Sequence, residues 1–502
     1  MTTFSFSVLS AAVAALVINV AHAAPVLVNS ITIAGSTKDL AAGDTANANR
    51  LGGFFSDMVY DNTTNKLYAL PDRGPGGGLV SYETRIQTFA LSVNPTTGAI
   101  SNLNLEATTR LTQSGQAFNG LNPSLLSGAS SPASTLGRSL DPEGLVRAPN
   151  GNFFVADEYG PRVAEFKADG TWIRDLVTPA NLQPRNSSGQ LEYVLGRQTS
   201  ALPNGVATGR QDNRGFEGLA ITPDGKRLVG IMQDPLVNEG LTGTTADGRF
   251  SQNLRIVAFD IATGQATGQY AYQLESLSTI NSRLPAGQTF TNGNSQGRNI
   301  GVSSITAINN NEFVVLERDN RGLGIDDPIG ATQSGSKRLY TINLTGATDI
   351  TNVSLAGTNT LPSGVVPVSK ALYYDILDAL QKAGLIVPEK LEAFTFGPRL
   401  TDGSLTFFIG SDNDFSVTQT GTGQQFDVCV NASGSVQTAL GAGCPTGYAL
   451  IPTYLFSFRA PASDFPTLTS LTTSVPLPGT ALLLGIGLLA SASRKSSLKR
   501  AG

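Results

Sequence analysis

The sequence predicts an all-β protein whose main body is a β-propeller with long loops on one face. Three observations lead to this prediction. A unit of two apolar strands ending on an acidic cluster recurs through residues 50–460, a further short strand follows each unit, and long helical patterns are nearly absent. The 55 glycines and the many Asn, Asp, Ser and Thr residues suit short strands joined by turns.

The repeating unit occurs five times, with starts roughly 75–90 residues apart, a spacing that suits four-stranded propeller blades. The five instances are 54–75, 141–161, 216–235, 302–321 and 391–415. The strands that follow them are Arg85–Val93, Val163–Lys167, Leu254–Asp260, Arg338–Leu344 and Tyr454–Arg459. We therefore expect five blades, and six or seven remain open if a loop hides a degenerate unit. A β-sandwich would not explain the repeats.

Three further features complete the predicted fold. The early strand Val26–Ile33 is expected to close the ring by joining the last blade. Segments 101–140, 181–213 and 272–300 are expected to be the long top loops. One amphipathic helix is expected over Ser369–Gly384, with a buried face made of Leu372, Tyr373, Ile376, Leu377 and Leu380.

The N-terminal residues 1–23 have the features of a signal peptide. They carry no acidic group, Val8 to Val20 is almost wholly apolar, and Ala21-His22-Ala23 supplies the small-x-small cleavage pattern. Because His22 is the chain's one histidine, the mature protein would have none. This excludes Ser-His-Asp hydrolases, histidine phosphatases and His-ligated zinc enzymes.

The C-terminal residues 475–502 combine a Pro-x-Pro opening, an apolar stretch and a basic end. This layout resembles a PEP-CTERM sorting signal, which implies processing by an exosortase and either attachment to the envelope or release. It departs from the pattern at Leu477, where the motif has Glu, and a plain transmembrane tail anchor is the alternative. Residues 461–474 would be the linker between this tail and the propeller domain at 24–460.

The cysteine content and the charge limit the cysteine chemistry and the kinds of binding partner that we expect. Cys429 and Cys444 lie in one Gly/Ser/Thr-rich segment of a chain expected to be exported, which favours a disulfide over a catalytic thiol that lacks a histidine. Charged residues make up 14% of the chain, the net charge is −4, and no basic stripe occurs. We expect a monomer that is processed by the signal peptidase and by the sorting machinery. It is expected to contact the membrane only through its tail and to bind no nucleic acid.

The repeats place acidic residues at matching positions. Glu143, Glu217 and Glu392 open the first strand of a unit, which is the innermost strand of a blade and lines the channel. The second strands close on Asp72, Asp157, Glu158, Asp234, Glu317, Asp319, Asp412 and Asp414. If the blades are related by rotation, these groups converge at one mouth, where oxygen ligands would suit Ca²⁺, with Mg²⁺ as the alternative.

Arginines accompany the same clusters and could bind an anionic substrate. They are Arg73, Arg162, Arg214, Arg318 and Arg321. The competing interpretation is that individual carboxylates hold turns or structural ion pairs, as is common at strand ends. For the set as a whole, a binding site at one mouth is the favoured prediction.

Five motifs in chain order carry a family resemblance. D-P-E-G-L with A-D-E-Y-G-P, N-R-G-F-E-G-L-A-I-T-P-D-G, L-E-R-D-N-R and S-D-N-D-F resemble the exported phytase-like family, also described as "esterase-like activity of phytase". The resemblance covers roughly residues 45–460 and implies a β-propeller that hydrolyses phosphoesters or esters. The sequence departs from the repeated pattern at Ser56-Asp57 and Ser303-Ser304, where the other units carry Glu.

Two hypotheses for function follow. In the first, the protein is a hydrolase of a small anionic or ester substrate. The predicted metal ligands are Glu143, Asp157, Glu217, Glu317, Asp319, Asp412 and Asp414. The predicted catalytic carboxyls are Glu143, Glu217, Glu392, Asp157 and Glu158. The predicted substrate-binding arginines are Arg73, Arg214, Arg318 and Arg162. In the second, the propeller is a non-catalytic surface or matrix module that binds metal, glycan or protein.

Overall fold

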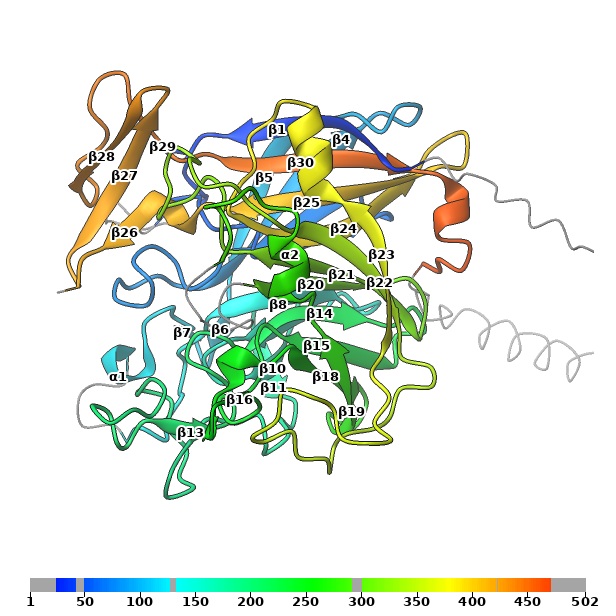
Figure 1. The fold of residues 1–502 in the computed structure, drawn as a ribbon. Helices are drawn as coiled ribbons and strands as arrows, with labels where there is room; N and C mark the ends of the chain where they lie inside the picture. The colour runs from blue at the N-terminus through cyan, green and yellow to red at the C-terminus, as the bar shows by residue number, and fades with distance from the viewer. Residues whose placement is uncertain (1–23, 42–48, 127–131, 291–299, 422, 471–502) are drawn as a thin grey trace, which may run out of the picture.

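The computed structural model describes residues 24–41, 49–126, 132–290, 300–421 and 423–470, and it contains five four-stranded antiparallel sheets arranged around a common centre (Figure 1). The first three blades run from the inner to the outer strand in chain order. They are β2 (Asp57–Asp61), β3 (Lys66–Leu70), β4 (Arg85–Val93) and β5 (Ile100–Arg110); β8 (Pro142–Arg147), β9 (Phe153–Asp157), β10 (Arg162–Phe166) and β11 (Trp172–Asp175); and β14 (Phe216–Ile221), β15 (Arg227–Met232), β18 (Asn253–Asp260) and β19 (Ala266–Gln273).

The last two blades complete the ring. The fourth consists of β20 (Ile300–Ala307), β21 (Glu312–Asp319), β22 (Lys337–Asn343) and β23 (Ser369–Asp375). The fifth consists of β24 (Lys390–Arg399), β25 (Leu405–Asp412), β30 (Thr453–Ala460) and β1 (Val26–Ile33). β1 pairs antiparallel with β30, from Val26 opposite Arg459 to Ile33 opposite Thr453, so the two ends of the chain close the ring together. The prediction of a five-bladed propeller closed by the first strand is confirmed.

Five of the hydrophobic clusters among the described residues lie one between each pair of neighbouring blades. Phe154 of the second blade packs with Phe216 of the third, Ile256 of the third with Val315 of the fourth, and the remaining interfaces follow the same pattern. Because each sheet is covered on both faces, its second strand is mostly apolar and buried, as in Leu405–Asp412, where every residue is buried. A single blade could not bury both faces alone, so the blades stabilise one another.

The predicted amphipathic helix over Ser369–Gly384 is wrong in its first half. Ser369–Asp375 forms β23, paired with β22, and only Ile376–Lys382 is helical, as α4. Asp375 caps α4 by accepting a hydrogen bond from the Asp378 amide at 3.1 Å. The edge of β22 offers backbone hydrogen-bond partners to Ser369–Asp375, and this pairing overrides the helical periodicity of that segment. Leu372, expected in the buried face, is half exposed as a result.

The remaining elements lie in the connections between strands. The segment predicted as a loop from residue 101 begins instead as β5, which continues to Arg110. Short hairpins pair β6 (Thr112–Gln113) with β7 (Gln116–Ala117), β12 (Arg185–Asn186) with β13 (Val206–Thr208), and β16 (Leu241–Thr242) with β17 (Thr245–Ala246). Short helices are α1 (Pro123–Leu126) and α2 (Leu277–Asn281), with 3₁₀ turns at Gly248–Phe250 and Ala462–Asp464. Phe465 is buried in the interface of the last two blades, so packed chain continues beyond residue 460.

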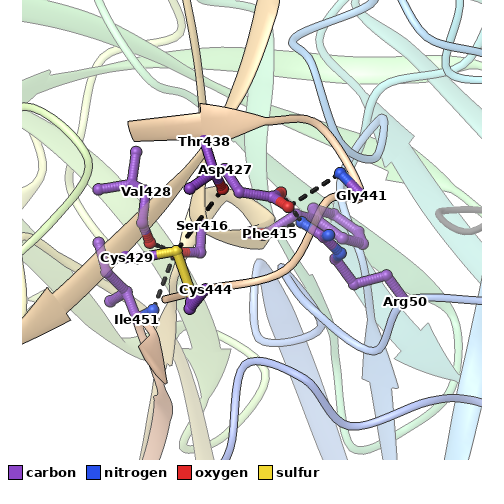
Figure 2. The surroundings of a disulfide bond; sticks show 10 residues. All are labelled: Arg50, Phe415, Ser416, Asp427, Val428, Cys429, Thr438, Gly441, Cys444 and Ile451. Carbon is purple, nitrogen blue, oxygen red and sulfur yellow. Dashed lines mark hydrogen bonds and ion pairs between the residues drawn. A yellow bond between two sulfur atoms is a disulfide. The ribbon is translucent and has the colours of Figure 1, made fainter. Parts of the chain in front are cut away.

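A small sheet is inserted between β25 and β30 and projects to the left of the propeller in Figure 1. It consists of β26 (Val417–Gln419), β27 (Gln425–Asn431), β28 (Gly434–Ala439) and β29 (Ala449–Leu450), and we call it the inserted sheet. A disulfide joins Cys429 to Cys444 within it (Figure 2).

The predicted leader (1–23) and sorting tail (475–502) lie outside the described residues. Within the described part of the chain, no helix combines the length and the apolar character needed to cross a membrane.

Candidate functional site

The start of each inner strand carries a β-bulge that turns one side chain towards the channel mouth. The strand registers shift between Pro142 and Gly144, Phe216 and Gly218, Val302 and Ser304, and Leu391 and Ala393. The residues at these bulges are Glu143, Glu217, Ser303 and Glu392, and Ser56 takes the same place in the first blade, where its amide and Asp57 share Leu70 as partner. A bulge re-aims a side chain at the end of a strand, so three glutamates point to one mouth.

The inner strands approach closely because the residue after each bulge is small. A Cβ atom on Gly144 would lie 2.9 Å from the Leu219 amide nitrogen, and one on Gly218 would lie 2.8 Å from the Ile305 amide nitrogen. Asp57 is the exception at this position. Its carboxyl is buried and accepts hydrogen bonds from the amides of Leu145 at 2.7 Å and Met58 at 2.9 Å, which links the first blade to the second. Burial raises the pKa of Asp57 well above its ordinary value.

The first group of carboxyls at the mouth is the glutamate cluster, which we define as Asp141, Glu143, Glu158 and Glu217. Oxygens of Asp141, Glu143 and Glu158 all lie within 4.8 Å of one another. Burial and the neighbouring carboxyl of Glu217 raise the pKa of Glu143 well above its ordinary value. Burial and the proximity of Glu158 do the same for Glu217, and burial together with Asp141 raises the pKa of Glu158 to about 7.

The carboxyls of Glu158 and Glu217 lie within hydrogen-bonding reach of each other. Several carboxyl oxygens at this mouth are buried without an N–H or hydroxyl donor among the described residues. They are Oε1 of Glu158 and Oε2 of Glu217, Glu389 and Glu392. The other oxygens of Glu217 and Glu392 are engaged, by the Gln233 amide at 2.5 Å and by the Arg318 guanidinium respectively. Buried polar atoms left without partners are costly, so this arrangement calls for a cation, a proton or a polar ligand.

The second group is the aspartate cluster of Asp72, Asp412 and Asp414, whose oxygens also lie within 4.8 Å of one another. Lys390 already supplies a positive charge here, with its ammonium 3.1 Å from Asp412, 2.6 Å from Asp414 and 3.9 Å from Glu392. Burial alone would lower the pKa of Lys390, but the carboxylates of Asp412 and Asp414 raise this pKa well above its ordinary value. The aspartate cluster is therefore internally neutralised to a larger extent than the glutamate cluster.

The predicted arginines differ in where they lie. Arg73 binds Asp141 at 3.0 Å, Arg318 binds Glu392 and donates to Ser303 at 2.9 Å, and Arg214 lies 3.3 Å from Asp234. Arg214 is the most exposed of these three, with a third of its side chain accessible. Arg162 instead donates to the Ser139 carbonyl at 2.9 Å and pairs with Asp157, on the outer side of the second blade's strand end.

Carboxyls outnumber cations at the mouth. Among the described residues the two clusters and their neighbours contain nine carboxyl groups, namely Asp72, Asp141, Glu143, Glu158, Glu217, Glu389, Glu392, Asp412 and Asp414, against four cations, Arg73, Arg214, Arg318 and Lys390. Such an excess of buried negative charge requires bound protons or a bound metal ion. All-oxygen donors of this kind fit Ca²⁺ or Mg²⁺.

The structure does not bring three predicted ligands into either cluster. In the strand registers, Asp157 and Glu317 occupy the same position, opposite the residue that precedes the bulge, and the next residue, Glu158 or Arg318, is the one at the mouth. Asp157 accepts hydrogen bonds from the Asp141 and Tyr159 amides at 2.9 and 3.0 Å. Because neighbouring residues of a strand face opposite sides, a shift of one position sends a carboxylate away from the mouth.

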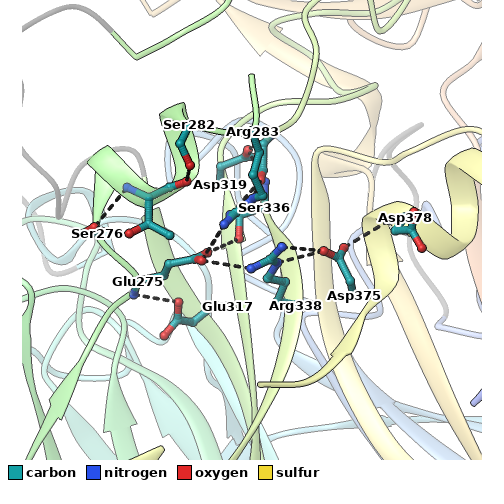
Figure 3. A network of polar contacts seen from close by, with 12 residues as sticks. Glu275, Ser276, Ser282, Arg283, Glu317, Asp319, Ser336, Arg338, Asp375 and Asp378 are labelled. Carbon is teal, nitrogen blue, oxygen red and sulfur yellow. Dashed lines mark hydrogen bonds and ion pairs between the residues drawn. The ribbon is translucent and has the colours of Figure 1, made fainter. Parts of the chain in front are cut away.

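Glu317 and Asp319 have partners of their own, and Figure 3 shows the contact between Glu317 and Glu275. Glu317 accepts hydrogen bonds from the Tyr272 hydroxyl at 2.5 Å and the Glu275 amide at 3.1 Å, and it pairs with Lys370. Asp319 binds the buried Lys337 ammonium at 3.0 Å, the Ser334 hydroxyl at 2.8 Å and the Ser336 amide at 2.9 Å. Both serve to hold neighbouring strands and loops in place.

Sequence reasoning missed Asp141, Glu389 and Lys390 as members of the site. Asp141 and Lys390 each stand two residues before a bulge glutamate, in D-P-E and K-L-E, and this spacing was the available signal. Glu389 precedes Lys390, and burial together with Asp414 raises the pKa of its carboxyl to about 7.

Fold and site together define a five-bladed β-propeller with buried carboxyl groups gathered at its channel mouth. The chain belongs to the phytase-like family, described as "esterase-like activity of phytase", whose sequence profile matches residues 49–415. A relative in the fungus Arthroderma benhamiae, named an uncharacterized secreted protein, is 30% identical over 319 residues, which cover 54% of this chain and 59% of the relative. The chain thus spans less than two thirds of that relative's length.

Solved structures show only distant likeness. Hydrazine synthase of Kuenenia stuttgartiensis aligns with 74% of this chain and 79% of its own at 10% identity and a TM-score of 0.27. Virginiamycin B lyase from Staphylococcus aureus aligns with 86% of this chain and 98% of its own at 10% identity and a TM-score of 0.28. Values this low establish neither a shared fold nor a shared activity.

Proposed function

We propose that the protein is a hydrolase of small phosphoesters or esters that binds a divalent cation, Ca²⁺ in the first instance, at the glutamate cluster. One observation carries the proposal. Carboxylate oxygens of Glu158, Glu217 and Glu392 are buried at the mouth without partners, where carboxyls exceed cations. A hard cation satisfies such oxygens and offsets their mutual repulsion.

The residues that would hold the cation are Asp141, Glu143 and Glu158, since one oxygen of each lies within 4.8 Å of the others. A divalent cation there would polarise a phosphoryl or carbonyl oxygen and acidify a bound water. The chain's own groups supply the rest. Arg214, a third exposed, would meet the anionic substrate, and Glu392, whose Oε2 has no hydrogen-bond donor among the described residues, would take a proton from water.

The experiment compares the purified mature protein with Glu217→Gln on phytate, p-nitrophenyl phosphate and p-nitrophenyl acetate, each with Ca²⁺ and with chelator. We expect turnover that needs Ca²⁺ and falls at least tenfold in Glu217→Gln, while the exposed Asp378→Asn leaves it unchanged. Turnover that is indifferent to chelator removes the metal mechanism. Calorimetric Ca²⁺ binding without turnover on any substrate would favour the non-catalytic surface module.

We also propose that the chain works outside the cytoplasm. The leader-like N-terminus, the Cys429–Cys444 disulfide and the secreted relative support export, and the tail's resemblance to a sorting signal supports envelope attachment or release after exosortase processing. Mass spectrometry of the native protein tests this. Mature termini after Ala23 and near residue 475 are expected, and intact termini in the cytoplasmic fraction would overturn it.

A further inference from the structure

A left-handed turn carries one of the mouth carboxylates. Directly after β25, Asp414, Phe415 and Ser416 have φ values of 47°, 54° and 56°. L-amino acids disfavour this region, and three consecutive non-glycine residues adopt it only when their surroundings hold them there. The first of the three, Asp414, belongs to the aspartate cluster.

Contacts from distant segments hold this turn (Figure 2). The guanidinium of Arg50, which is almost fully buried, donates from one nitrogen to the Phe415 carbonyl at 3.1 Å and to the Asp427 carboxylate at 2.7 Å. Asp427 also accepts a hydrogen bond from the Gly441 amide at 2.9 Å. Arg50 therefore ties the turn to β27, the central strand of the inserted sheet.

A second set of hydrogen bonds joins the turn to the inserted sheet. The Ser416 hydroxyl donates to the Val428 carbonyl at 2.6 Å and accepts from the Ile451 amide at 2.8 Å. Val428 precedes Cys429, which is bonded to Cys444. The turn is thus hydrogen-bonded to the inserted sheet, which the disulfide closes, and Arg50 joins the turn to the same sheet.

The position of the turn decides where the Lys390 ammonium lies. Asp412 accepts a hydrogen bond from the Asp414 amide at 2.7 Å, and the two carboxylates together draw Lys390 to 3.1 and 2.6 Å. Glu392 is the next carboxylate, at 3.9 Å from the same ammonium. If Asp414 moved away, Lys390 would turn to Glu392, a neighbour of Glu143, and its positive charge would come closer to the proposed cation site.

We propose that Arg50 is a positioning residue for the mouth: by holding the turn Asp414–Ser416 against the inserted sheet, it keeps Lys390 on Asp412 and Asp414 and prevents it from moving onto Glu392, beside the glutamate cluster. The inference rests on the proposed cation site. It identifies a residue outside the clusters that sets the affinity of that site for its cation.

The test uses paired substitutions that leave no buried unpaired charge. Arg50→Met with Asp427→Asn should weaken Ca²⁺ binding, measured by calorimetry, about tenfold. Arg50→Lys should retain most of the affinity, because one ammonium can reach both acceptors of the single guanidinium nitrogen. The control is Arg255→Met with Glu239→Gln, which removes another buried pair, joined at 2.6 Å, and should leave Ca²⁺ affinity unchanged.

A third variant separates positioning from general loosening. In a Lys390→Gln background the Arg50→Met/Asp427→Asn pair should no longer weaken Ca²⁺ binding, since no ammonium remains to move. A loss of affinity that persists there overturns the proposal, as does unchanged affinity in the Lys390 protein. If the wild type binds no Ca²⁺, the proposed function fails. Hydrogen exchange at residues 412–416 then still tests the positioning: faster exchange in the Arg50 pair supports it, and unaltered exchange refutes it.

Discussion

Replacing Glu143 by glutamine should stabilise the metal-free protein and abolish its stabilisation by Ca²⁺. Glu143 is the sharpest place to perturb the mouth. Its carboxyl has no hydrogen-bond partner among the described residues, and the carboxyls of Glu217, Asp141 and Glu158 all act to raise its pKa. The amide keeps the shape of the side chain and removes its charge.

The magnitude follows from the geometry. Two unit charges 4.8 Å apart repel by about 3 kcal/mol at an effective dielectric constant of 20. Protonation of Glu143 would remove the repulsion, but holding a proton at pH 7 on a group with an ordinary pKa of 4.5 also costs about 3 kcal/mol. Glutamine avoids both costs, so we expect the free energy of unfolding in chelator to rise by about 1–3 kcal/mol.

The assay is urea unfolding followed by circular dichroism, in chelator and in saturating Ca²⁺. The wild type should gain about 2.7 kcal/mol when Ca²⁺ is at one hundred times its dissociation constant, and Glu143→Gln should gain almost nothing. Glu106→Gln, which removes an exposed partner of Lys66, should stay within about 0.5 kcal/mol of the wild type in both conditions. A Glu143→Gln protein that is less stable than the wild type in chelator would refute the account of the mouth as a site of uncompensated charge.

Three further predictions concern stability elsewhere. Cys429→Ser with Cys444→Ser, which opens a loop with a sequence separation of 15, should lower the stability of the inserted sheet by about 3 kcal/mol, seen as faster hydrogen exchange over 425–451 and not in the blades. Phe407→Ala, which removes a fully buried ring stacked 4.9 Å from Phe458, should cost about 3–5 kcal/mol of unfolding free energy in urea. Glu275→Gln should lower stability at pH 7. Despite burial, hydrogen bonds from Arg283 and the charge of Arg338 lower the pKa of Glu275, so its contribution is present above pH 4.5 and is lost as the pH falls through the folded pKa. The difference between the two proteins should therefore vanish in acid, and a constant difference would contradict the ion-pair explanation.

The propeller could be predicted because each repeat contains, within a short stretch of sequence, the strands and turns that form one blade. An inner strand, a turn and a largely apolar second strand recur five times, and strands such as Leu405–Asp412 are buried on both faces because neighbouring blades cover both. The ring closure by Val26–Ile33 followed from counting strands per unit. The segment Ser369–Asp375 was mispredicted as helix because its pairing partner, β22, lies in another part of the sequence, and a local pattern does not contain that competition.

The site was predictable in part for the same reason. Acidic residues at matching places in the repeats indicated which strand ends meet, and Glu143, Glu217 and Glu392 do lie at the mouth. What the sequence does not reveal is which of two adjacent residues faces inward. Glu317 and Arg318 differ by one position, and the bulge in β20 decides that Arg318 reaches Glu392 while Glu317 binds Lys370.

The two serines at the bulge position explain why the mouth is asymmetric. A ring with glutamate at all five bulges would gather five carboxylates around one axis. Here Ser303 accepts a hydrogen bond from Arg318, and Ser56 donates to the Gly53 carbonyl, so the fourth and first blades contribute no bulge carboxylate. Arg318 fills the space beside the fourth blade, and Lys390 with the aspartate cluster lies beside the first and fifth. The bulge carboxylates that no cation contacts are therefore Glu143 and Glu217, on the second and third blades. Under the proposed function, a cation bound there would lie close to Arg214, whose charge already acts on Glu158 and which would bind the anionic substrate.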